Sequence, residues 1–129
     1  MSKQILKTEK APAPIGPYNQ AIIANGMLFV SGQVAIVPET GELETGDIET
    51  ETKRVMQNLE AILQEAKLTW EHVVKTSIFL SDMGLFATVN TIYGSYFSGD
   101  FPARETVAVK TLPKNVNVEI SLIAVMQLG

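Results

Sequence analysis

Two charged residues near the C-terminal end of the chain lie beside apolar sequence and could do chemistry. Arg104 stands in Asp100-Phe101-Pro102-Ala103-Arg104-Glu105-Thr106, and Glu119 lies in the apolar run from Val116 to Met126. The planar guanidinium of an arginine can hold a carboxylate through two parallel hydrogen bonds, and a carboxylate among apolar neighbours needs a partner or a task. The alternatives are a surface pair of Arg104 with Glu105 and a structural ion pair of Glu119, made with Arg104 or at a subunit interface.

Further polar residues occur at positions that could line a ligand site. Asn90 lies on the same helical stripe as aromatic residues, where it either satisfies a buried backbone group or faces a ligand. Ser31, next to the flexible Gly32, either offers a hydroxyl and backbone donors or ends a strand. Tyr18 follows a proline-rich arm and either walls a cleft or anchors that arm.

The composition excludes several classes of protein. The 129 residues fit one domain, residues 1–129, and 46% hydrophobic against 19% charged residues excludes a disordered chain. The net charge is -4 without any run of Lys or Arg, so nucleic-acid binding is not expected. No segment is apolar over the length of a membrane span, and we expect a cytoplasmic protein. With no cysteine and His72 as the only histidine, thiol chemistry is excluded and no metal site is predicted.

The spacing of apolar residues predicts an α+β fold with one sheet and two helices. Asn25-Gly26 is a hairpin signal, Asp47 is a plausible helix N-cap, and the aromatic stripe of the second helix ends at Gly99. The predicted order is strand, strand, helix, strand, helix, strand, strand, over residues 21–24, 27–30, 47–66, 73–80, 81–99, 106–110 and 116–126. Two amphipathic helices can cover only one face of such a sheet.

The uncovered face is where we place the two charged residues. If the last two strands form a hairpin, alternation puts Val107 and Val109 under the helices and Arg104 beside Glu119 on the opposite face. That face would also carry apolar side chains, namely those of Met27, Phe29, Val73, Phe79, Ile123 and Val125. A face of this kind needs a cover, so we expect a closed oligomer in which sheets pack together.

Short sequence blocks spread along the whole chain resemble one known family. The sequence is similar to the Rid family (YjgF/YER057c/UK114), in its RidA branch of 2-iminobutanoate/2-iminopropanoate deaminases. The blocks are Ile15-Gly16-Pro17-Tyr18, Val30-Ser31-Gly32-Gln33, Val74-Lys75-Thr76, Phe86-Ala87-Thr88-Val89-Asn90, Phe101-Pro102-Ala103-Arg104, Leu112-Pro113-Lys114 and Val118-Glu119-Ile120. The resemblance implies a chorismate-mutase-like α+β fold with a mixed sheet. It also implies a homotrimer whose sheets form a central barrel, with a ligand cleft at each subunit interface.

The resemblance also implies a reaction and residue roles. A small 2-imino acid would be hydrolysed to a 2-keto acid and ammonia without a cofactor. Arg104 would bind the substrate carboxylate, with Ser31 and the Gly32 backbone, and Glu119 would handle the hydrolytic water. Tyr18, Asn90 and Thr106 would line the cleft; these three residues complete the site that the resemblance implies.

Thr106 departs from the family pattern, because many relatives carry cysteine there and this chain has none. A mechanism that needs a thiol is therefore excluded, and substrate preference could differ. The first alternative function is a regulatory protein that binds a small keto acid or amino acid without turnover. The second is a ribonuclease or translation inhibitor, which the acidic balance of the chain argues against.

Overall fold

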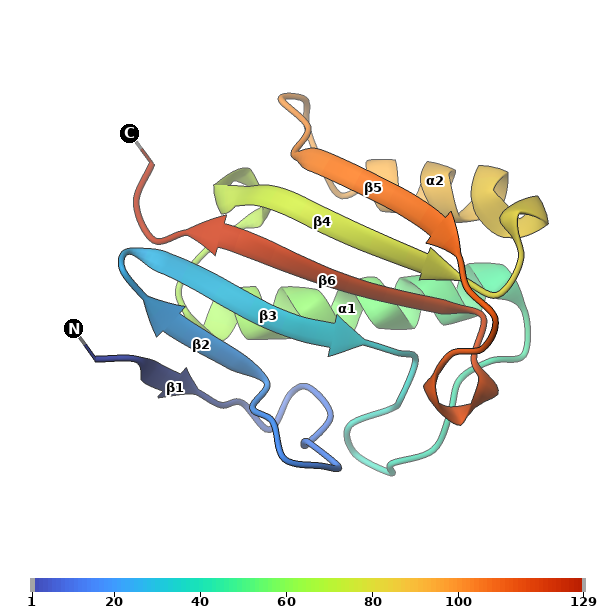
Figure 1. The fold of residues 1–129 in the computed structure, drawn as a ribbon, viewed down its shortest axis with the longest axis horizontal. Coiled ribbons are helices and arrows are strands. Elements are labelled where there is room, and N and C mark those ends of the chain that lie inside the picture. Colours follow the sequence, from blue (N-terminus) through green and yellow to red (C-terminus); the bar gives the residue numbers. More distant parts are fainter. Residues whose placement is uncertain (1, 129) are drawn as a thin grey trace.

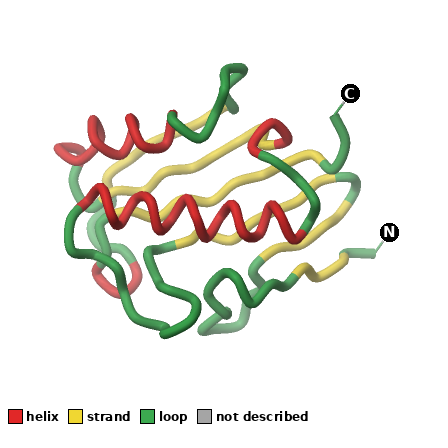
Figure 2. Tube along the Cα trace, turned by 180° about the vertical axis from the view of Figure 1, so that it is seen from behind, coloured by secondary structure: helices red, strands yellow, loops and turns green. Residues whose placement is uncertain are grey.

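The computed structural model describes residues 2–128 and consists of one six-stranded mixed sheet with two helices on one face (Figures 1 and 2). The strand order across the sheet is β1-β2-β3-β6-β4-β5. The strands are β1 (Gln4–Leu6), β2 (Ala21–Ala24), β3 (Met27–Gln33), β4 (Val73–Leu80), β5 (Ala103–Ala108) and β6 (Val118–Val125), and the helices are α1 (Ile48–Glu65) and α2 (Phe86–Gly94). No helix within residues 2–128 is long and apolar enough to cross a membrane.

Local signals account for several elements. Asn25 and Gly26 both have positive φ, 53° and 75°, which is the backbone of a tight hairpin turn between β2 and β3. Asp47 caps α1 as predicted, because its carboxylate accepts a hydrogen bond of 2.8 Å from the Thr50 N–H. The strand predicted over residues 73–80 has the bounds of β4.

One buried acidic residue ties α1 to the sheet. Glu51 has no exposed surface, and its carboxylate accepts hydrogen bonds from the backbone N–H of Asn117 (2.7 Å), the side-chain amide of Asn117 (2.9 Å) and the backbone N–H of Val118 (3.1 Å). Those donors lie at the start of β6. The carboxylate is therefore compensated by three donors and holds the helix in register with the central strand.

The predicted hairpin of the last two strands is wrong. β5 is an edge strand that pairs parallel with β4, and β6 lies between β3 and β4, antiparallel to both. The chain leaves β5 at one end of the sheet and returns to its middle through a short 3-10 turn, Pro113–Asn115, where Lys114 and Asn115 have positive φ. β4 therefore separates the two strands, and the register that we expected between them does not exist.

Three smaller differences from the prediction concern an additional strand, the end of the second helix and the position of Val73. β1 was not predicted, and it extends the sheet by pairing with β2. α2 ends at Gly94 rather than Gly99, although Tyr96 and Phe97 still pack against the core after the helix. Val73 belongs to the core beneath the helices, at 5% exposure, and not to the opposite face.

The face of the sheet away from the helices is largely apolar, and it faces the viewer in Figure 1. The strand pairings align Ile5, Ile22, Phe29 and Ile123 in a row across β1, β2, β3 and β6. Phe29 is 41% exposed, and Val107 on the edge strand is 43% exposed, so the prediction of Val107 in the core is wrong. An uncovered apolar sheet face of this kind marks a surface suited to packing against another protein surface.

Candidate functional site

Arg104 lies on the edge strand β5 with its side chain toward α2. It stands beside Thr76 in the parallel register of β4 and β5, and Thr76 is buried under the helices. The Arg104 Nη1 donates a hydrogen bond of 2.7 Å to Oδ1 of Asn90 in α2. Its guanidinium carbon lies 5.2 Å from the centre of the Tyr93 ring and 5.5 Å from that of Phe86. One amide and two ring faces thus orient the guanidinium and leave most of its donors free.

A buried hydrogen bond fixes one of those rings. The Tyr93 hydroxyl lies 2.8 Å from Oγ1 of Thr76, and both residues are buried. Burial raises the pKa of Tyr93, an effect larger than the opposing influences of Thr76 and Arg104, so the hydroxyl stays protonated at neutral pH. The Tyr93 ring, which lies beside the guanidinium, is therefore held in place by a hydrogen bond to Thr76 of strand β4.

The guanidinium opens into a hollow of about 410 Å³ that Asn90, Tyr93, Gly94, Phe101, Pro102 and Arg104 line. Its walls combine the polar side chains of Asn90 and Arg104 with the rings of Tyr93 and Phe101, and Arg104 is the only charged side chain among them. Thr106, two residues along β5 on the same face, has a buried Oγ1 without a hydrogen-bond partner. This arrangement can bind a small anion that has an apolar part.

A second group of polar residues gathers around the end of β3. Glu119 packs against Gly32, where a Cβ atom would come within 2.8 Å of the Glu119 carboxyl carbon, so a larger residue at position 32 would displace the Glu119 carboxylate. Burial raises the pKa of Glu119. Ser31 donates through Oγ to the carbonyl oxygen of Asn19 at 2.6 Å, which occupies its hydroxyl proton. Tyr18, 48% exposed, lines a small hollow together with Gly32.

The comparison with known proteins identifies the family. The model of the family described as Endoribonuclease L-PSP matches residues 8–126. The chain belongs to this family, also called YjgF/Rid. A RutC family protein of Synechocystis is 53% identical over 128 residues, covering 98% of each chain, and a protein of the mouse named 2-iminobutanoate/2-iminopropanoate deaminase is 44% identical, covering 95% of this chain and 91% of the relative.

A solved structure supports the fold. The crystal structure of Escherichia coli TdcF with bound serine has a TM-score of 0.90 and 37% identity, covering 95% of this Rid chain and 98% of that one. The six-stranded sheet with two helices is thus the fold of the family.

The two groups of site residues in this Rid protein lie on opposite faces of the sheet, and the prediction that Arg104 and Glu119 share a face is wrong. Glu119 stands beside Phe79 in the register of β4 and β6, between the buried Val118 and Ile120, so it points away from the helices. Arg104 stands beside Thr76 and points toward them. Thr106 goes with Arg104 for the same reason.

The seven predicted site residues therefore fall into two groups, which we call candidate half-sites. The arginine half-site consists of Arg104, Asn90 and Thr106, and the glutamate half-site consists of Glu119, Gly32, Ser31 and Tyr18. The contacts of Phe86 and Tyr93 with the guanidinium were not predicted from the sequence. Their signal was present, because both lie three or four residues from Asn90 on one helical stripe, but an aromatic stripe is usually core.

His72 has a structural role. Its Nδ1 accepts a hydrogen bond of 3.1 Å from the backbone N–H of Thr69 and thereby caps the 3-10 turn Trp70–His72. The side chain stands before β4 and belongs to neither half-site.

Proposed function

We propose that this protein hydrolyses small reactive 2-imino acids, such as 2-iminobutanoate and 2-iminopropanoate, to 2-keto acids and ammonia. The observation that carries the proposal is the guanidinium of Arg104, oriented by Asn90 and two aromatic rings at the mouth of a hollow that is partly aromatic. A 2-imino acid offers a carboxylate for that guanidinium and a short alkyl group for the hollow. The name of the mouse relative supports the same reaction.

Glu119 provides the second requirement of the reaction, a base for water. In the first step the water oxygen bonds to the carbon of the protonated C=N group, the π electrons move to nitrogen, and Glu119 takes one water proton. In the second step Glu119 returns that proton to the amine, the C–N bond breaks, and ammonia leaves with the hydroxyl proton as ammonium. Burial raises the pKa of Glu119, which makes its carboxylate a better base than an exposed one.

The proposed assembly for this reaction is a homotrimer, the oligomer that the family resemblance implies. Within one chain the sheet separates Arg104 from Glu119, so one substrate cannot contact both half-sites of the same subunit. The apolar face that carries Phe29 and Ile123 offers a surface on which a neighbouring sheet can pack. In such a trimer, the arginine half-site of one subunit would meet the glutamate half-site of the next, and Thr106 would contact the substrate.

The alternatives make different demands on the same residues. A regulatory protein that only binds a keto acid would need Arg104 but not Glu119. A ribonuclease would need cations along a phosphate backbone, whereas the hollow beside Arg104 has one cationic side chain in its lining. The carboxylate anchor therefore favours a small substrate with a single carboxylate.

The experiment generates 2-iminobutanoate in place with a threonine dehydratase and traps it with semicarbazide. We expect the wild-type protein to divert the imine to 2-ketobutanoate faster than it is trapped, and Arg104→Ala to lose this effect. Hydrolysis no faster than the spontaneous rate would exclude the deaminase. Binding of 2-ketobutanoate without turnover would instead identify the regulatory alternative.

A further inference from the structure

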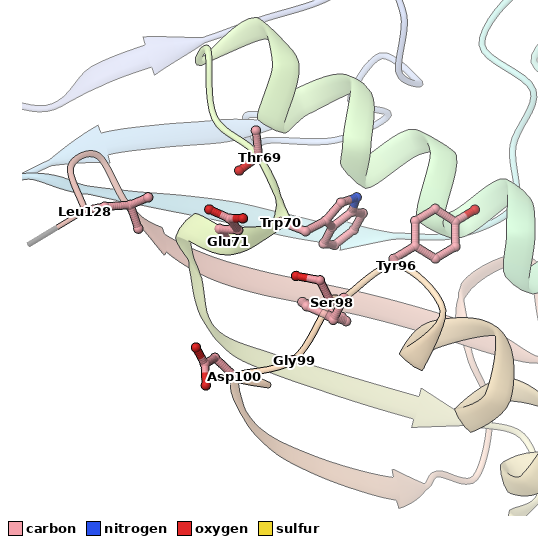
Figure 3. A pocket seen from close by; sticks show the side chains of 9 residues that line it. Thr69, Trp70, Glu71, Tyr96, Ser98, Gly99, Asp100 and Leu128 are labelled. Carbon is pink, nitrogen blue, oxygen red and sulfur yellow. The ribbon is translucent and has the colours of Figure 1, made fainter.

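A second hollow, of about 750 Å³, lies at the opposite end of β4 from the turn that leads into α2 (Figure 3). Its walls come from the 3-10 turn Trp70–His72, from the segment between α2 and β5, and from Leu128. The rings of Phe97 and Phe101, 6.0 Å apart, stand between it and the hollow beside Arg104. The reaction proposed above uses none of its side chains.

Aromatic rings form much of its surface. Trp70 contacts Tyr96 and Phe97, with ring centres 5.4 Å apart in both pairs and interplanar angles of 59° and 69°. The indole N–H donates to Oε2 of Glu60 in α1 at 2.7 Å, which turns the polar edge of Trp70 toward the helix. The cluster is thus fixed in orientation, and Figure 3 shows the Trp70 and Tyr96 rings side by side at the hollow.

The two charged residues that line this hollow are both negative. Glu71 and Asp100 line the hollow, and no Lys, Arg or His side chain is among its lining residues. Within residues 2–128 the ion pairs are Arg54–Glu44 and Lys75–Glu105, so neither lining carboxylate is neutralised by a cation of the same chain. Glu60 adds a third negative charge behind the rings and, after burial, is the next cause of the raised pKa of Tyr96.

We propose that this hollow binds an organic ammonium ion. The faces of Trp and Tyr rings attract cations, and the attraction grows where water is displaced. Two carboxylates without cationic partners provide the counter-charge at the same place. The ligand class is opposite in charge to the carboxylate that Arg104 would bind, so the two hollows select different molecules.

Trp70 is the only tryptophan of the chain, so its fluorescence reports on this hollow alone. The probe is choline, and the control is its neutral isostere 3,3-dimethyl-1-butanol, titrated into the whole protein. We expect choline to change the Trp70 emission with a dissociation constant in the millimolar range, and the isostere to bind at least about fivefold more weakly. Equal effects of the two probes, or no effect of choline, would overturn the proposal.

Substitutions of the lining residues test whether choline binds in this hollow. The double variant Glu71→Gln, Asp100→Asn should weaken choline binding at least about fivefold, and Tyr96→Leu should weaken it while keeping the Trp70 reporter. The matched control is Glu39→Gln, Glu42→Gln, which removes two exposed loop carboxylates and should bind choline as the wild type does. An unchanged affinity in the first double variant contradicts the site. Imine hydrolysis by that variant should be unchanged, so failure of choline binding leaves the proposed deaminase untouched.

Discussion

Three contacts hold the Arg104 guanidinium, and only the one to Asn90 uses a hydrogen-bond donor. The ring of Tyr93 is the nearer of the two aromatic contacts, and its hydroxyl is bonded to Thr76. Ring and hydroxyl therefore have separable roles, since the ring positions the guanidinium and the hydroxyl stabilises the fold.

Substitutions of Tyr93 test this separation. In Tyr93→Leu the guanidinium loses its ring face, and we expect KM for the imine to rise about tenfold with kcat little changed. In Tyr93→Phe the ring remains, so KM should stay near wild type, while the unpaired Thr76 hydroxyl lowers the free energy of unfolding by about 1 kcal/mol. Steady-state kinetics measure KM and kcat, and urea denaturation measures the free energy of unfolding. An equal rise of KM in the two variants would show that the ring does not position Arg104.

The burial that raises the pKa of Glu119 makes it a better base, and the same burial lowers the stability of the fold. Because burial raises its pKa, the ionised carboxylate is less favourable in the folded than in the unfolded chain. At pH values above the raised pKa, Glu119 therefore destabilises the fold. At pH values below the ordinary range of glutamate it is neutral in both states, and this destabilisation disappears.

The variant Glu119→Gln separates the effect of Glu119 on stability from its effect on catalysis. We expect kcat for imine hydrolysis to fall by about 10²–10⁴, the range for loss of a general base. The free energy of unfolding should rise at neutral pH, and this gain should shrink to nothing as the pH falls below the ordinary range of glutamate. Urea denaturation at a series of pH values measures this gain in the free energy of unfolding. A gain of constant size at every pH would mean that the raised pKa is not its source.

At the scale of secondary structure, the predictions that succeeded rest on residues close together in the sequence. The cap at Asp47, the turn at Asn25-Gly26 and the β-branched run of β4 each follow from a few neighbouring residues. The partner of β5 depends instead on which strand lies beside it in space, and a parallel partner gives no short-range signal. The error in strand pairing placed Arg104 on the wrong face of the sheet in the sequence-based prediction.

Glu51 is another feature that local sequence does not reveal, because its three donors lie 66 and 67 positions away. Glu51→Ala would leave these buried donors without an acceptor, and we expect the free energy of unfolding to fall by about 3 kcal/mol. The matched control is Glu49→Ala, an exposed residue in the same turn of α1, which should change stability by no more than about 0.5 kcal/mol. Similar losses in both variants would contradict the tie between α1 and β6.

At the scale of the whole molecule, the division of the site by the sheet makes the proposed trimer a requirement for activity. Each complete site would combine Arg104 of one subunit with Glu119 of a neighbour, so a chain that lacks one residue can still contribute the other half-site. Arg104→Ala and Glu119→Gln should both be inactive as pure proteins. The two variants can nevertheless rescue each other if they assemble into one oligomer.

Mixing the two inactive variants tests this arrangement directly. After dissociation, mixing in equal amounts and reassembly, a given site receives an intact arginine half-site in half of the cases and an intact glutamate half-site in half of the cases. When the half-sites come from different subunits, these two probabilities of one half are independent and multiply. About a quarter of wild-type activity should therefore return. Sites built within one chain would never combine both intact residues, and the mixture would stay inactive. Sedimentation of the mixture shows whether trimers have re-formed, and the pure variants, treated in the same way, measure the background.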